Sequence, residues 1–114
     1  IRVAKKYDKA LSKIQGLILP INKKDRNHIY HLYSIRITSD YHLTRDELFA
    51  KLHKLGVGCS VQYIPLHQMS YNKKIIQKNH KFPNADLIKN QVLCIPIYPK
   101  ITDKQIQKVI SILK

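Results

Sequence analysis

The stretch VLCIPIYPKITDKQIQKVISIL, residues 92–113, holds a strand signal, the end of that strand and a complete helix. The apolar run 92–97 is typical of a buried strand. Because Pro96 has no amide hydrogen to donate to a neighbouring strand, we predict that this strand lies at an edge or ends there. Thr102 and Gln105 fit a capping box, which predicts the start of a helix. The core face of that helix is predicted to contain Ile106, Val109, Ile110 and Leu113.

The residues upstream predict further helices and strands. Thr44 and Glu47 fit a second capping box, and Gly56 is a suitable stop for the helix that begins there. Residues 28–37 alternate with apolar groups on both faces, which predicts a well-covered strand. The remaining predicted helices cover 1–14, with Gly16 as the stop, a short segment around 71–78, and a segment from Phe82 with Ala85 and Ile88 facing inward.

The stretch VGCSVQYIPLHQMSYNKK, residues 57–74, begins like a strand and ends as something else. Alternating apolar groups over 57–63 predict a strand, and Pro65 stops the pattern. Polar and aromatic side chains follow, among them His67 and Tyr71. A loop of this kind can be an ordinary strand exit, or it can contact a sugar or a phosphate through the histidine and the tyrosine hydroxyls. The residues alone leave both interpretations open.

Together these elements predict one domain over residues 1–114, of the α/β (α+β) class. We expect a small three-stranded, partly antiparallel sheet packed with helices. The chain begins at Ile1 rather than at methionine, so we expect it to be a piece of a longer protein. No apolar run approaches the roughly 20 residues of a membrane span. We expect a cytoplasmic protein in which Cys59 and Cys94 are free, buried thiols.

The net charge of +14 and the pI near 9.9 raise the question of nucleic-acid binding, because basic surfaces attract phosphates. Only four of the 21 basic residues are arginine, the residue favoured for phosphate and base-edge recognition. The lysines are also spread along the chain. We therefore favour a solvated, lysine-rich surface. A free-standing basic nucleic-acid-binding module remains the alternative function, and a scaffold domain without a ligand is a third hypothesis.

The sequence contains no complete catalytic or metal-binding pattern. The six histidines are scattered, and the spacing of His28 and His31 would put them on opposite faces of a strand. There is no glycine-rich phosphate loop and no nucleophile elbow. We therefore predict no catalytic residue and no metal ligand in this chain.

Six segments, taken in order, resemble one protein family. They are HLY at 31–33, RDEL at 45–48, LGVG at 55–58, VQYIPLH at 61–67, FPNA at 82–85 and CIPIYP at 94–99. Their order is similar to that in the C-terminal domain of the DegT/DnrJ/StrS nucleotide-sugar aminotransferases, which are pyridoxal-phosphate enzymes of the aspartate aminotransferase fold. The resemblance covers nearly the whole chain.

The resemblance implies a larger enzyme around this domain. An N-terminal domain, absent from this chain, would bind pyridoxal phosphate and supply the Schiff-base lysine. The intact homodimeric parent would transfer an amino group, from glutamate, to a nucleotide-linked keto sugar in polysaccharide or glycan biosynthesis. The protein would orient the cofactor and tune its electronics. We therefore expect the 114 residues alone to be inactive and to bind no cofactor.

The resemblance also implies that the loop after the 57–63 strand faces the nucleotide sugar. This assigns Gln62, Tyr63, His67 and Tyr71 as substrate-binding residues. The turn from Tyr63 through His67 to Tyr71 is similar to that of family members that aminate 4-keto-6-deoxy sugars linked to UDP. Gln62 departs from the family, which often has histidine at this position, so any contact made here is with a neutral amide.

Overall fold

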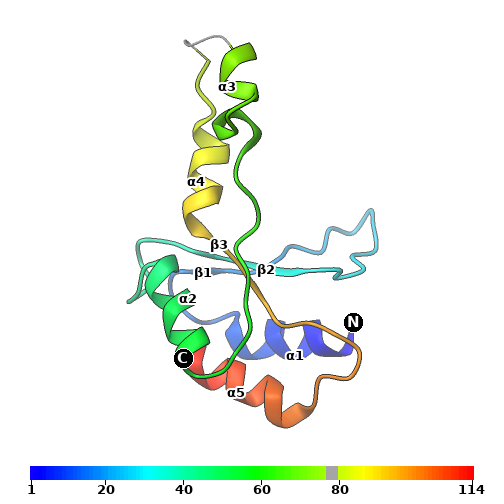
Figure 1. Ribbon diagram of the computed structural model, residues 1–114. Helices are drawn as coiled ribbons and strands as arrows, with labels where there is room; N and C mark the ends of the chain where they lie inside the picture. The colour runs from blue at the N-terminus through cyan, green and yellow to red at the C-terminus, as the bar shows by residue number, and fades with distance from the viewer. Residues whose placement is uncertain (77–79) are drawn as a thin grey trace.

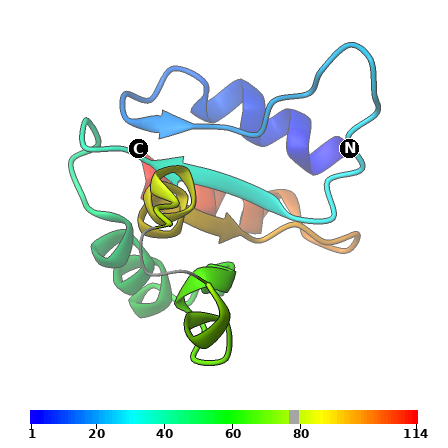
Figure 2. The same ribbon diagram turned by 90° about the horizontal axis from the view of Figure 1, so that it is seen from above.

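The computed structural model describes residues 1–76 and 80–114. At its centre, β2 (Tyr33–Ile37) pairs antiparallel with β3 (Val92–Ile95). The short strand β1 (Leu17–Ile18) pairs antiparallel with the other edge of β2, so the strand order is β1-β2-β3. Figure 2 shows the three strands side by side, with β2 in the middle. The predicted three-stranded sheet packed with helices is confirmed, and its described strands are antiparallel throughout.

Helices occupy both sides of this sheet (Figure 1). They are α1 (Arg2–Leu11), α2 (Arg45–Lys54), the 3-10 helix η1 (Leu66–Gln68), α3 (Asn72–Ile75), α4 (Pro83–Gln91) and α5 (Asp103–Leu113). Figure 1 shows α1 and α5 together on one side of the sheet, while α3 and α4 project from the other side.

The hydrophobic core lies between the sheet and the pair α1 and α5. Along β2, Tyr33, Ile35 and Ile37 are buried and the two residues between them are half-buried, which is the pattern of a strand with one core face. Ile35 lies opposite Leu93 of β3, and both are fully buried. The core face predicted for α5 is confirmed, because Ile106, Val109, Ile110 and Leu113 are all buried.

Three buried tyrosines tie distant segments to this core through their hydroxyl groups. Tyr7 donates a hydrogen bond of 2.8 Å to the carbonyl of Pro96, and Tyr41 donates one of 2.9 Å to the carbonyl of Leu113. Tyr33 donates to a carboxylate oxygen of Asp8. Burial raises the pKa of all three phenols, so they remain protonated donors at neutral pH.

Both predicted capping boxes are present. The Thr44 side chain accepts from the amide of Glu47, and the Glu47 carboxylate accepts from the amide of Thr44. These bonds lower the pKa of Glu47. Thr102 and Gln105 form the equivalent pair at the start of α5. Gly56 follows α2 with a φ of +70°, which confirms it as the stop of this helix.

The strand predicted over 57–63 is wrong. Only Ser60 pairs there, through an isolated antiparallel bridge to Cys94. The alternation predicted by the sequence decays along the segment: Val57 is buried, Val61 is 40% exposed and Tyr63 is 76% exposed. Continued antiparallel pairing would put Tyr63 opposite Gln91, which is the last residue of α4, so the four-residue strand β3 is too short to pair with the whole segment. The third strand is instead β1.

Other boundaries differ from the prediction. The helix predicted over 1–14 ends at Leu11, and the strand predicted over 28–37 begins at Tyr33. The prediction that Ile88 faces inward is wrong, because α4 projects away from the sheet and from α1, α2 and α5, which together we call the body, and Ile88 is 44% exposed. The short helix predicted around 71–78 is α3, and the end of that prediction at Lys78 lies outside the described residues. Within the described ranges, no helix is long and apolar enough to cross a membrane.

A glycine substitution tests how closely the connection into β1 approaches the loop after β2. Gly16 has a φ of +78°, and a Cβ there would overlap the backbone of Asp40 and Tyr41. We expect Gly16→Ala to destabilise the chain by about 2–4 kcal/mol, from left-handed backbone strain and overpacking together. Chemical denaturation measures the loss. The matched control is Gly58→Ala, whose added Cβ meets nothing within 4 Å. Equal effects of the two substitutions would contradict this packing.

Candidate substrate-binding site

The predicted site residues lie on a projection that we call the arm, residues 61–76 and 80–91. Figure 1 shows the arm standing away from the side of the sheet that α1 and α5 do not cover. It leaves the body after the Ser60–Cys94 bridge and returns through α4, which leads directly into β3. None of the described arm residues is buried. Other contacts must therefore fix the arm's shape, because no hydrophobic core of its own does so.

The first such contact is a tight turn at residues 65–68, where the segment that leaves the body ends. Pro65, with φ −56° and ψ 140°, precedes η1, and its carbonyl accepts a 2.8 Å hydrogen bond from the amide of Gln68. Since the proline ring fixes φ near this value, the direction of the chain into η1 is locally determined. This turn places His67 on the side that faces α4.

His67 joins the two legs of the arm. Its Nε2 lies 2.8 Å from Oδ1 of Asp86 on α4. Its ring stacks on Phe82 with centroids 4.8 Å apart and an interplanar angle of 23°. The His67 side chain is only 17% exposed. A hydrogen bond in the ring plane and a stacked ring across that plane together restrict the imidazole to one orientation.

Two further residues extend this contact into a chain of hydrogen bonds. Gln68 donates from Nε2 to Oδ1 of Asp86 at 2.6 Å, and Lys89 donates to Oε1 of Gln68 at 2.5 Å. A carboxylate can only accept and an ammonium can only donate, so the orientation of the Gln68 amide is determined by its two partners. We call these four residues, His67, Gln68, Asp86 and Lys89, the arm network.

The other predicted site residues occupy different environments. Tyr63 is 76% exposed and Tyr71 is 73% exposed. Gln62 lies at the base of the arm, where its Nε2 donates to the hydroxyl of Ser60 at 3.1 Å. The Oε1 atom of Gln62 is buried without a hydrogen-bond partner among the described residues, so it retains the capacity to accept one more hydrogen bond.

The structure thus places all four predicted residues along one leg of the arm but does not gather them into one pocket. Among the described residues, no hydrogen bond or ring contact joins any two of Gln62, Tyr63, His67 and Tyr71. Sequence reasoning missed Asp86, Lys89 and Phe82 as their neighbours. No spacing rule could have found Asp86, because it lies 19 residues from His67 and meets it only through the return of α4.

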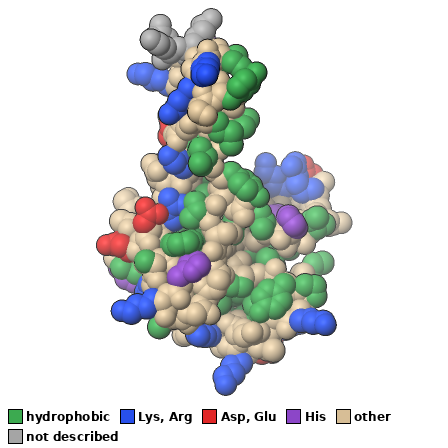
Figure 3. Space-filling view, viewed as in Figure 1, with side chains coloured by type: hydrophobic (Ala, Val, Ile, Leu, Met, Phe, Trp, Pro, Cys, Tyr) green, Lys and Arg blue, Asp and Glu red, His purple; other side chains and the backbone are tan. Residues whose placement is uncertain are grey.

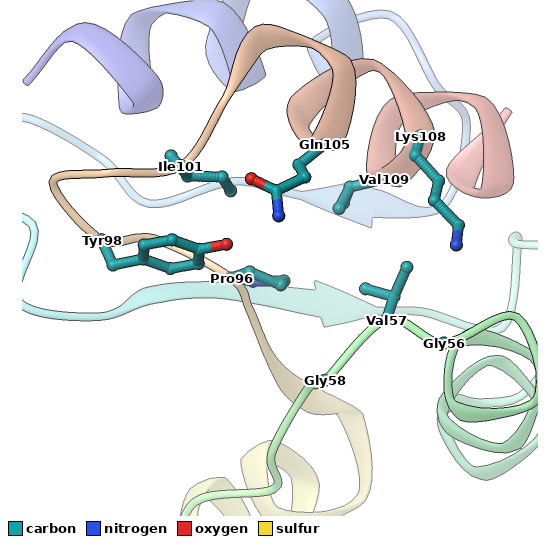
Figure 4. Close-up of a pocket in the computed structure, with 9 residues that line it drawn as sticks. All are labelled: Gly56, Val57, Gly58, Pro96, Tyr98, Ile101, Gln105, Lys108 and Val109. Atoms are coloured by element: carbon teal, nitrogen blue, oxygen red, sulfur yellow. The ribbon is translucent and has the colours of Figure 1, made fainter.

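A cavity lies elsewhere, between α5 and the segment 56–58, and measures about 290 Å³. Figure 4 shows its lining, which includes Tyr98, Gln105 and Lys108 but none of the predicted site residues. Lys108 is exposed, and no carboxylate belongs to the lining. The lining therefore does not fit pyridoxal phosphate, which needs a lysine for its aldehyde and an acidic partner for its ring nitrogen.

The described residues also offer no thiolate and no metal centre. Burial raises the pKa of Cys59 to about 11, with a smaller effect from Cys94, so this thiol is protonated at neutral pH and is a poor nucleophile. Cys94 is free and buried, as predicted, whereas Cys59 is half-buried. Over 1–76 and 80–114, no group of three or more His, Cys, Asp or Glu side chains could hold a metal ion.

The chain is similar to known proteins over nearly its whole length. The chain matches the model of the DegT/DnrJ/EryC1/StrS aminotransferase family over residues 1–114. It is 36% identical over 114 residues to an uncharacterised protein of Methanocaldococcus jannaschii. It is 32% identical over 115 residues to the spore coat polysaccharide biosynthesis protein SpsC of Bacillus subtilis. Each comparison covers 98% of this chain and 30% of the relative, so the chain spans about a third of their length.

A solved structure shows the same fold. The fold of this chain matches that of DesV from S. venezuelae, solved in complex with a ketimine intermediate. The TM-score is 0.86 and the sequence identity is 27%. The match covers 97% of this chain and 29% of DesV, and it falls on the C-terminal part of the sugar aminotransferases. This chain belongs to the DegT/DnrJ/EryC1/StrS aminotransferase family.

Proposed function

We propose that this chain is the C-terminal domain of a longer pyridoxal-phosphate-dependent sugar aminotransferase, and that its arm forms one wall of the substrate site. The parent enzyme would transfer an amino group from glutamate to a nucleotide-linked keto sugar. The cofactor would supply the electron-sink chemistry when bound to the N-terminal part. The residues of this chain would bind and orient the sugar nucleotide, chiefly through His67.

The observation that carries this proposal is the family match over the whole chain, combined with an arm that has no core. On this arm, a carboxylate and a stacked phenyl ring together hold the side chain of His67. Ordered polar side chains on a projection are expected where a ligand is bound, because binding sites need side chains fixed before the ligand arrives.

The arm also carries an apolar surface that supports a larger assembly. Figure 3 shows apolar side chains gathered along one side of the arm. Five apolar or aromatic residues of the described arm are more than 60% exposed, namely Tyr63, Ile64, Leu66, Tyr71 and Ile75. Exposed apolar groups gathered in this way mark interaction sites. We propose that the N-terminal part of the parent covers them in the homodimeric enzyme, since about 70% of each relative's chain lies outside the matched region.

Nucleic-acid binding is supported less well. Figure 3 shows the lysine and arginine side chains scattered over the visible face rather than gathered in a stripe. Single-strand binders combine a basic groove with aromatic stacking platforms. In contrast, Tyr7 and Tyr33 lie in the core rather than on an open sheet face.

The first prediction concerns the apolar side of the arm. In the isolated chain this surface should bind an environment-sensitive hydrophobic dye such as ANS. We expect the double substitution Ile64→Ser and Leu66→Ser to lower dye fluorescence about twofold or more, because it removes two exposed apolar side chains. The control is Ile29→Ser, which changes a body residue that is 81% exposed. If the control lowers the fluorescence as much as the arm variant does, the arm is not an apolar interaction surface and the proposed packing of another domain on it is contradicted.

The second prediction concerns the cofactor. Because the cavity lining does not fit pyridoxal phosphate, the 114-residue chain should retain none after gel filtration. Borohydride reduction followed by peptide mapping should find only scattered lysine adducts, as expected for exposed amines. The Lys108→Arg variant is the control for the one cavity lysine. A stoichiometric adduct at a single lysine would contradict the assignment of the cofactor to another domain.

The third prediction concerns His67 in the longer enzyme. His67→Ala should lower kcat/KM for the keto sugar nucleotide about 2- to 10-fold, the effect of one neutral hydrogen bond. Lost ground-state binding would raise KM, whereas a contact made only in the transition state would lower kcat. Steady-state kinetics and thermal melts are recorded together, with the exposed body residue His42 changed to alanine as the control. Unchanged kinetics with a lowered Tm would show that His67 is structural.

A further inference from the structure

The arm network engages one ring nitrogen of His67, Nε2, and leaves the other, Nδ1, for a ligand. Asp86 accepts at Oδ1 from both His67 and Gln68. A carboxylate oxygen accepts, so this hydrogen bond requires a proton on Nε2 of His67. In the neutral ring, Nδ1 is then an acceptor with a lone pair. No hydrogen bond from a protein group to this Nδ1 occurs among the described residues.

Gln68 and Lys89 help to hold the His67 ring in one orientation. The two nitrogens Gln68 Nε2 and His67 Nε2 lie 3.4 Å apart, and both donate toward the same carboxylate oxygen rather than to each other. Lys89 fixes the opposite end of the Gln68 amide. Rotating the imidazole by half a turn about the Cβ–Cγ bond would put Cε1 in place of Nε2 and remove the bond to Asp86, although the stack on Phe82 would remain. The ring therefore has one favoured orientation.

We propose that Asp86 is a positioning residue that holds His67 with Nδ1 toward the substrate, and that Nδ1 accepts a hydrogen bond from a sugar hydroxyl rather than contacting the diphosphate. This inference rests on the proposed function of the arm and deepens it. The chemical reason is that an acceptor nitrogen pairs with a hydroxyl donor, while a diphosphate offers only acceptors and would repel the lone pair. Asp86 acts through His67 and does not touch the substrate.

The test uses the longer enzyme and a set of variants at one position. Asp86→Ala removes the acceptor and should raise KM for the keto sugar nucleotide about 2- to 10-fold, as His67→Ala does. Asp86→Asn keeps a side-chain oxygen that can accept from both donors, so it should retain most of the wild-type KM. The double variant His67→Ala with Asp86→Ala should be no worse than His67→Ala alone, because residues that act through one contact are not additive. Asp40→Asn, at an exposed carboxylate on the body, is the matched control for loss of charge.

Two additional readouts separate positioning from mere stability. The nitrogen-15 spectrum of the imidazole in the 114-residue chain should show a single Nε2–H form with an observable ring proton. That proton should be lost to exchange in Asp86→Ala and kept in Asp86→Asn. In inhibition assays, His67→Ala should weaken binding of the sugar nucleotide but leave the inhibition constant of the nucleoside diphosphate alone unchanged.

The outcomes are distinguishable. If His67→Ala changes kinetics but Asp86→Ala changes only Tm, the positioning role is wrong and the proposed site survives. If the two arm variants are both kinetically silent, the proposed substrate wall fails and this inference fails with it. If His67→Ala weakens the nucleoside diphosphate as strongly as the sugar nucleotide, the assignment to a sugar hydroxyl is overturned.

Discussion

The antiparallel pairing of β2 with β3 is the interaction on which the other elements depend. It joins segments about 60 residues apart in the chain, with Tyr33 opposite Ile95 and Ile35 opposite Leu93. The core face of this pair is closed by α1 and α5. Because α4 runs directly into β3 and Ser60 bridges to Cys94, the same ladder also anchors both ends of the arm. Loss of the pairing would therefore remove the core and the support of the candidate site together.

The body and the arm are stabilised by different physical means. The body buries aliphatic side chains and three tyrosines whose hydroxyl groups reach backbone carbonyls or a carboxylate. The described part of the arm buries no residue, and its two legs are joined by the arm network and by the stack of His67 on Phe82. Polar contacts of this kind add modest stability but define direction well. That combination suits the proposed role of the arm as a wall that orients a ligand.

The sequence predicted those elements whose signals are local. The two capping boxes, the stop at Gly56 and the core face of α5 follow from residues three or four apart, and the structure confirms each of them. The strand predicted over 57–63 failed because strand formation requires a partner, and alternation does not reveal that β3 has only four residues, Val92–Ile95. The strand β1 was missed because two residues are too short to show a period. At the candidate site, the segment predicts His67 as a substrate-binding residue, and this stays a prediction. Its contact with Asp86 could not be predicted, because only tertiary structure brings α4 beside η1.

The central claim is that the arm presents Nδ1 of His67 to the sugar of a nucleotide-linked substrate. The most direct measurement is a crystal structure of the longer enzyme with the sugar nucleotide bound. We expect Nδ1 of His67 to lie about 2.7–3.2 Å from a sugar hydroxyl, with Nε2 still on Asp86. A sugar nucleotide bound out of reach of the arm, or a His67 ring turned so that Nδ1 meets only protein atoms, would contradict the claim.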